Sequence, residues 1–260
     1  MIKTRQAGFY HELSEVARTR RGSLRGMLGI RRLTVQRRKG GTMAEQDEQP
    51  IEDIEEIAGA EDTQLVLGDD DERDADLHEE ILSQETAWSG KIFDVECLEV
   101  KLPNGRVSRR DVVRHHGAVA IVALTESGKI ALVRQYRTAL DRVTVEIPAG
   151  KLEPGEDPLD CAKRELKEET GFVPGRIAYL TTIASSCGFS DELIHLYLAT
   201  QLSFEGANPD EDEFLNVDLV DVQELVDAVL DGKIEDAKTV VGALACDVMA
   251  HRLAAEAAQA

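Results

Sequence analysis

The chain of 260 residues is long enough for one or two domains, and 42% hydrophobic with 31% charged residues is typical of a protein with a sizeable core. It has no run of about 18 apolar residues, which excludes a membrane-spanning helix. The formal net charge of −20 argues against sequence-independent binding to nucleic acid or anionic lipid. Four widely separated cysteines without a Cys-x-x-Cys pair predict free thiols in a reducing cytoplasm.

Residues 1–42 form a basic segment with 11 Lys and Arg and 2 acidic residues, so its net charge is +9 and that of the remainder is −29. Three interpretations stay open: an arm that binds nucleic acid, a targeting peptide, or a stretch outside the native protein. The third arises because Lys-Gly-Gly-Thr-Met at 39–43 can be encoded by a ribosome-binding sequence followed by a start codon, so that Met43 would be the first residue. Residues 43–85 are acidic and poor in aromatics, and we expect a disordered tail there.

The folded part is expected from residue 86. Residues 91–102 alternate between apolar and polar, and the Pro-Asn-Gly turn at 103–105 connects them to a second predicted strand at 107–114. This hairpin defines an N-terminal strand region at 86–115, followed by a second domain at 116–260. The second domain has further predicted strands at 118–124, 130–136, 143–147, 177–183, 193–199 and 215–220, and predicted helices at 158–170, 222–230 and 237–258. Strands and helices mixed around one core predict an α/β or α+β class.

Candidate chemistry lies on the predicted helix at 158–170. Glu165, Glu168 and Glu169 have spacings of 3 and 4, which places three carboxylates on one helical face. Such like charges repel one another by up to a few kcal/mol when partly buried. A divalent cation relieves the repulsion, and hard oxygen ligands suit Mg²⁺ or Mn²⁺. Arg164 lies four residues before Glu168 and is expected to fix the direction of that carboxylate. The simpler alternative is a solvated acidic surface.

The longer sequence string around this helix is more specific. It runs from Gly150 over five residues to Glu156, then over seven more to Arg-Glu-Leu-Lys-Glu-Glu-Thr-Gly-Phe at 164–172. This string resembles the Nudix box at every required position. Resemblance to Nudix hydrolases extends over about residues 86–250 and implies an α/β/α sandwich with a mixed sheet. It also implies cleavage of a diphosphate linked to another moiety, with bound Mg²⁺ or Mn²⁺.

Neighbouring motifs resemble the ADP-ribose pyrophosphatase group of that family. They are Glu-Ile-Pro-Ala-Gly at 146–150, Val-Arg-Gln-Tyr-Arg at 133–137, and Ser-Cys-Gly-Phe-Ser-Asp-Glu at 186–192. Cys187 departs from the group, which usually has proline there. In the group an N-terminal sheet is exchanged between two subunits, so the resemblance implies a homodimer formed through the 86–115 region.

The resemblance also assigns roles to individual residues. Implied metal ligands are Glu165, Glu169, the carbonyl of Ala149 and Glu213, with Glu168 near the metal and Glu211 as general base. Since acidic loops are common in this chain, the alternative for Glu211 and Glu213 is that they only solvate their loop. Arg137 is the candidate for gripping a phosphate or ribose, or else forms a surface ion pair. Other candidate substrate contacts are Glu146, Ser190 and Glu192, and Trp88 either stacks on adenine or packs.

The implied function is Mg²⁺-dependent hydrolysis of ADP-ribose, or of a related nucleoside diphosphate sugar, to AMP and a sugar phosphate. One alternative is a Nudix hydrolase for GDP-mannose or a dinucleotide polyphosphate. Another, from a different class, is a non-catalytic nucleotide sensor, against which the intact Arg-Glu-x-x-Glu-Glu string argues. We expect a small-molecule substrate in the cytoplasm, with no membrane or nucleic-acid partner.

Overall fold

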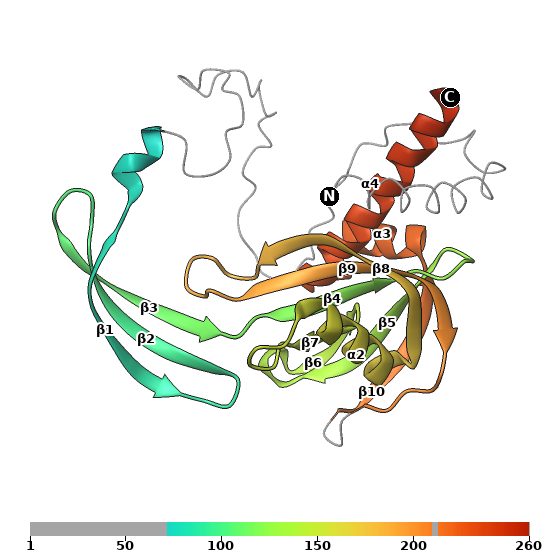
Figure 1. Ribbon diagram of the computed structural model, residues 1–260, viewed down its shortest axis with the longest axis horizontal. Helices are drawn as coiled ribbons and strands as arrows, with labels where there is room; N and C mark the ends of the chain where they lie inside the picture. The colour runs from blue at the N-terminus through green and yellow to red at the C-terminus, as the bar shows by residue number, and fades with distance from the viewer. Residues whose placement is uncertain (1–71, 210–212, 260) are drawn as a thin grey trace, which may run out of the picture.

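The computed structural model describes residues 72–209 and 213–259 (Figure 1). Its strands are β1 (Glu80–Ser89), β2 (Phe93–Lys101), β3 (Val107–His115), β4 (Ala118–Ala123), β5 (Lys129–Arg137), β6 (Arg142–Glu146), β7 (Ala149–Lys151), β8 (Phe172–Ala184), β9 (Leu193–Phe204) and β10 (Leu215–Asp221). Its helices are α2 (Pro158–Thr170), α3 (Val222–Leu230) and α4 (Ala237–Gln259), with short 3₁₀ turns η2 (Glu72–Leu77) and η3 (Thr138–Leu140).

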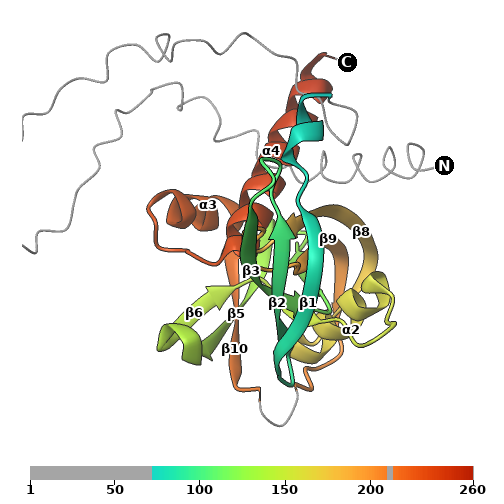
Figure 2. The same ribbon diagram turned by 90° about the vertical axis from the view of Figure 1, so that its left-hand side faces the viewer.

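The strands form three sheets, in the orders β1-β2-β3, β10-β5-β6 and β7-β4-β9-β8. All named pairs are antiparallel except β4 with β9, so the last sheet is mixed. The β1-β2-β3 sheet projects away from the rest of the fold in Figure 1 and faces the viewer in Figure 2. Every residue of β1 is solvent-exposed. The described residues of one chain therefore leave β1 uncovered, whereas Leu98 and Val100 of β2 are buried.

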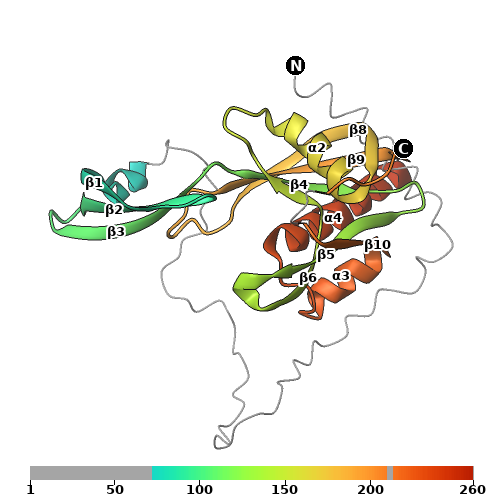
Figure 3. The same ribbon diagram turned by 90° about the horizontal axis from the view of Figure 1, so that it is seen from below.

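The core explains why residues 118–124 are continuously apolar. Alternate side chains of β4 point to opposite faces, as the two-residue period of a strand requires. Val119 and Ile121 pack in one buried cluster with Leu166 of α2, whereas Ala120 and Val122 pack in another with residues of α3 and α4. Figure 3 shows α2 on one side of β4 and α3 with α4 on the other. The predicted α/β/α sandwich with a mixed sheet is thus confirmed.

Helix α2 has the predicted bounds because both ends carry local signals. Asp157 caps the N-terminus, where its carboxylate accepts hydrogen bonds from the backbone N–H groups of Leu159 (2.9 Å) and Asp160 (3.3 Å). Pro158 occupies the first turn, where its missing N–H costs nothing. Gly171 ends the helix at φ 74°, a left-handed conformation that glycine adopts without strain.

The sequence-based boundaries differ from the structure at several places: β8 and β9, for example, extend beyond the predicted 177–183 and 193–199. β1 begins at Glu80, six residues before the expected start of the fold, so the prediction of a disordered tail to residue 85 is wrong for these residues. Short strand β7 was not predicted either. Residues 1–71 lie outside the described part, and the division into domains stays a prediction. Across residues 72–209 and 213–259, no helix combines the length and apolar character needed to cross a bilayer.

Candidate active site

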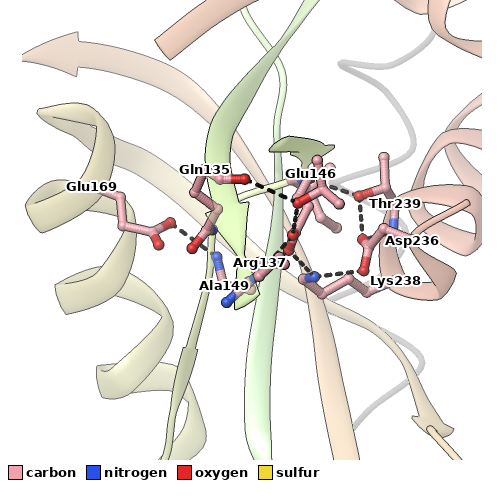
Figure 4. A network of polar contacts seen from close by, with 10 residues as sticks. Gln135, Arg137, Glu146, Ala149, Glu169, Asp236, Lys238 and Thr239 are labelled. Atoms are coloured by element: carbon pink, nitrogen blue, oxygen red, sulfur yellow. Dashed lines mark hydrogen bonds and ion pairs between the residues drawn. The ribbon is translucent and has the colours of Figure 1, made fainter. Parts of the chain in front are cut away.

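The carboxylates of Glu165 and Glu169 lie on the buried side of α2. Glu165 is 8% exposed and Glu169 is 2% exposed. The backbone N–H of Ala149, at the start of β7, donates to Glu169 Oε2 over 3.0 Å (Figure 4). Antiparallel pairing with β4 fixes the position of β7 beside α2. The helix and the short strand therefore bring together three of the predicted metal ligands, Glu165, Glu169 and Ala149.

Gly150 makes room for the Glu165 carboxylate. A Cβ atom at this position would lie less than 3.0 Å from three atoms of that carboxylate group, closer than real Cβ contacts. The backbone of Gly150 has no left-handed φ, so conformational freedom does not explain the glycine. Its missing side chain leaves the space that the carboxylate fills. This is the physical reason for glycine at the first position of the 150–172 string.

Arg164 holds three carboxylates at the other edge of the cluster. Its Nε and Nη2 donate to the two oxygens of Glu156 over 3.0 and 3.1 Å. Its Nη1 donates to Glu165 Oε1 (2.8 Å) and Glu168 Oε2 (2.9 Å). The guanidinium lowers the pKa of Glu156 to about 2. Arg164 thus fixes the directions of Glu165 and Glu168, as its sequence spacing predicted for Glu168.

The electrostatics of the cluster favour a bound cation. Burial, with the charges of Glu165 and Glu213, raises the pKa of Glu169 to about 8, against the Ala149 N–H and the Arg137 charge, which lower it. Burial also raises the pKa of Glu165, with Glu168 and Glu213 acting in the same direction and Arg164 against it. A cation that binds between such groups removes both the desolvation penalty and the mutual repulsion.

The donor set fits a hard divalent cation by its chemistry, because carboxylate and carbonyl oxygens are the ligands such ions prefer. As the side chains stand, however, no three His, Cys, Asp or Glu residues of the described part lie close enough to enclose an ion. Arg164 occupies oxygens of Glu165 and Glu168. Binding of an ion would therefore compete with Arg164 for Glu165 and displace the proton that burial favours on Glu169.

Arg137 and Glu146, two predicted substrate contacts, form a pair (Figure 4). Arg137 Nε and Nη2 each donate over 2.7 Å to a different oxygen of Glu146, and Thr144 donates to Oε1 over 2.6 Å. Lys238, from α4, donates to Oε2. Although burial opposes the charged form, Arg137 and Lys238 hold the pKa of Glu146 at about 2. Arg137, with 42% of its side chain exposed, thus forms an ion pair with a buried carboxylate, and its contact with a phosphate stays a prediction.

Ser190 and Glu192 lie elsewhere, where the β8–β9 loop contacts β3. The backbone N–H of Glu192 donates to Ser190 Oγ over 3.2 Å, and Glu192 Oε1 is 3.5 Å from His115 Nδ1. Beside them is a shallow cavity of about 410 Å³, lined by this loop and Val112 of β3. The described polar contacts of Ser190 and Glu192 lie within this region, and they do not involve the carboxylates of α2.

The predicted acidic loop is described only in part. Glu211, the predicted general base, lies outside the described residues. Glu213 is exposed, and its charge raises the pKa values of both Glu165 and Glu169, which places it on the same side of the molecule as the cluster. Trp88 is 53% exposed on β1 and packs against Phe93 in a tilted arrangement, with ring centroids 5.4 Å apart and an interplanar angle of 52°.

Sequence reasoning missed Asp236, Lys238 and Thr239 at the start of α4. Lys238 is 9% exposed and Thr239 is fully buried, which is unusual for their residue types. An aspartate before the first helical residue is a recognisable N-cap signal. Nothing in the sequence indicated that the lysine would reach Glu146, 92 residues earlier.

The α/β/α fold thus places two buried carboxylates, Glu165 and Glu169, beside Gly150 of β7, and their oxygens are of the kind that hard divalent cations prefer. The NUDIX domain family matches residues 114–241. The chain is 45% identical over 165 residues to the ADP-ribose pyrophosphatase of Bacillus subtilis (strain 168), which covers 63% of this chain and 89% of that protein. The chain therefore belongs to the Nudix hydrolase family, whose members generally use divalent metal ions.

Two further comparisons extend this result. The chain is 45% identical over 167 residues to the methanol dehydrogenase activator of Bacillus methanolicus, covering 64% of this chain and 90% of that protein. A crystal structure of an ADP compounds hydrolase matches with a TM-score of 0.59 at 24% identity, over 66% of this chain and 94% of that one. At this identity, the structural match supports the fold.

Proposed function

We propose that the chain hydrolyses the pyrophosphate bond of ADP-ribose, or of a closely related nucleoside diphosphate sugar, to AMP and a sugar phosphate. The observation that carries this proposal is the buried pair Glu165 and Glu169 beside Gly150, whose carboxylate oxygens are ligands that a divalent cation prefers. The relative from Bacillus subtilis, similar over 89% of its length, supports the choice of substrate.

In this proposal Glu165, Glu169, the Ala149 carbonyl and Glu213 would hold Mg²⁺, or Mn²⁺ in its place. Such an ion neutralises phosphate charge and lowers the pKa of bound water. Glu211 accepts a proton from the attacking water, whose oxygen forms a bond to one phosphorus as the anhydride P–O bond breaks. The bridging oxygen leaves with the other phosphoryl group, so that AMP and the sugar phosphate are the two products.

In this proposal Arg164 positions carboxylates of the site, and Arg137 contacts the substrate. Arg164 keeps Glu165 and Glu168 in fixed directions through its contacts of 2.8 and 2.9 Å, respectively. Arg137 uses Nε and Nη2 on Glu146, and Nη1 is the guanidinium nitrogen outside that pair. Arg137 is therefore the candidate phosphate contact. Ser190 and Glu192 are proposed to contact the rest of the substrate.

We further propose a cytoplasmic homodimer built through the β1-β2-β3 sheet. Ile81 and Trp88 are 55% and 53% exposed on β1, and Val107 is 59% exposed on β3. Uncovered apolar side chains of this size mark interaction surfaces. Cys97, Cys161, Cys187 and Cys246 are free thiols, which suits a reducing compartment. Light scattering coupled to gel filtration tests the dimer, since a monomeric mass at micromolar concentration contradicts it.

A substrate panel tests the activity. Full-length protein with Mg²⁺ is incubated with ADP-ribose, GDP-mannose and a dinucleotide polyphosphate, followed by alkaline phosphatase and phosphate measurement. The phosphatase releases phosphate from the monoester products and not from intact ADP-ribose. We expect ADP-ribose to give the highest rate, and Glu169→Gln to lose most of it. Preference for another nucleotide contradicts the substrate, whereas tight binding without turnover indicates a sensor.

A further inference from the structure

The first turn of α4 holds the end of β6. The carboxylate of Asp236 caps the helix by accepting from the backbone N–H of Thr239 over 3.0 Å, and it also accepts from Thr239 Oγ1 over 2.5 Å. Thr239 Oγ1 in turn accepts from the backbone N–H of Ile147 over 2.8 Å. Asp236 also accepts from Lys238 Nζ over 2.7 Å, which aims the ammonium at Glu146. Asp236 therefore orients the side chains of both Thr239 and Lys238.

The resulting chain of charges has a buried end and an exposed end (Figure 4). The side chain of Lys238 is 10% exposed and that of Glu146 is 3% exposed, whereas that of Arg137 is 42% exposed. Two cations face two anions, Glu146 and Asp236. Arg137 is the most exposed of the four side chains, since that of Asp236 is 19% exposed, and it is close enough to Glu169 for its charge to lower the pKa of that group.

We propose that Lys238 is a positioning residue for phosphate binding: by sharing the charge of Glu146, it leaves the guanidinium of Arg137 incompletely neutralised and aimed at the substrate. This inference rests on the proposed function, in which Arg137 contacts a phosphate. Without Lys238, Arg137 becomes the only counter-ion of a buried carboxylate, and the group as a whole gains one negative charge. Both changes weaken attraction for an anionic substrate, since Coulomb interactions are strong where water is excluded.

Lys238→Met tests the proposal because it keeps the length and packing of the side chain and removes the charge. We expect Kd for ADP-ribose, measured by calorimetry in EDTA, to rise about tenfold, which corresponds to about 1.4 kcal/mol. KM with Mg²⁺ should rise in parallel, with kcat within about twofold. Lys233→Met is the matched control. Lys233 pairs with Asp231 on the surface, with 70% of its side chain exposed, so its loss should leave Kd and KM unchanged.

A double-mutant cycle separates positioning from general damage. In a Glu146→Gln background the carboxylate charge that Lys238 shares is absent, so Lys238→Met should have no further effect on Kd. Lys238→Arg should keep the Kd of the wild type, because it retains the positive charge. An unchanged Kd in Lys238→Met, or an equal effect in both backgrounds, overturns the proposal. If Lys238→Met melts below the assay temperature, Lys238→Gln is judged by the same criteria.

Failure of the proposed function is distinguishable in the same experiment. If wild-type protein neither binds nor cleaves ADP-ribose, the substrate assignment fails. The role of Lys238 is then tested with the nucleotide from the panel that the wild type does cleave. If wild-type protein cleaves ADP-ribose and the cycle shows no coupling between Lys238 and Glu146, only the positioning role fails.

Discussion

Gly150→Ala should separate activity from stability. The added methyl would overlap the Glu165 carboxylate, which has to retreat until it reaches the 3.4–4 Å of an ordinary contact. A carboxylate at the end of a side chain can move without disturbing the backbone, so the fold should tolerate the change. Misplacement of a catalytic group on the order of 1 Å can cost about 100-fold in rate. Gly→Ala at an allowed φ, by contrast, stabilises a protein by about 0.4–1 kcal/mol through the unfolded chain.

The assay compares kcat for ADP-ribose with the midpoint of urea unfolding, both on purified protein. We expect kcat to fall by roughly 100-fold and the unfolding midpoint to stay or rise slightly. Gly232→Ala is the converse control: nothing lies within 4 Å of a Cβ there, but its φ of 69° is left-handed, so the unfolding midpoint should fall while kcat stays unchanged. Wild-type kcat in Gly150→Ala would refute the account of this glycine, as would loss of folding.

Three further changes test the electrostatics of the site and the cysteines. Burial raises the pKa of Glu169 to about 8 from an unfolded value of 4.5, so the folded protein favours the neutral carboxyl. The contribution of this neutral form to folding stability is fully present below pH 4.5 and is lost as pH rises through 8. In EDTA, Glu169→Gln should therefore exceed wild type in urea stability by a few kcal/mol above pH 8 and by little at pH 4; parallel pH curves contradict this. Arg164→Lys keeps one charge but cannot hold three carboxylates, so kcat should fall roughly 10- to 100-fold, and an unchanged kcat would rule out the orienting role. Iodoacetamide at pH 8 should modify exposed Cys187 and spare Cys161 and Cys246, whose pKa values burial raises to about 12; peptide mapping that finds all three modified equally would show that both buried sites open readily.

The helix of the site could be predicted because its signals are local. Asp157, Pro158 and Gly171 mark its ends, and the spacing of the glutamates fixes their common face within one turn. A continuous apolar run also identified β4, because both of its faces are buried. None of these inferences needs to know what lies far away in the chain.

The missed features depend on distant partners. β7 has three residues, and its pairing with β4 defines it more than its own sequence does. β1 is exposed along its length, so it lacks the alternation by which a half-buried strand is recognised. Lys238 reads as an ordinary polar residue of a helix until the fold brings it to Glu146. Sequence periodicity reports which face is buried, and not which buried charge will find a partner.

The segment between Glu146 and Gly150 is where the local and the distant parts of the site meet. Ile147 N–H donates to Thr239 of α4, Pro148 has no N–H and its carbonyl accepts from Ile121 over 2.8 Å, and Ala149 N–H donates to Glu169 of α2. Each of these backbone groups thus has a partner on a different element, and leaving one unpaired would cost roughly 1–3 kcal/mol. One side of the segment carries Glu146, which orients Arg137, and the other carries Ala149 and Gly150, which receive the two buried glutamates. A shift of this short segment would therefore move the candidate phosphate contact and the candidate cation ligands together, and α4, outside the Nudix box, fixes its position as firmly as α2 does.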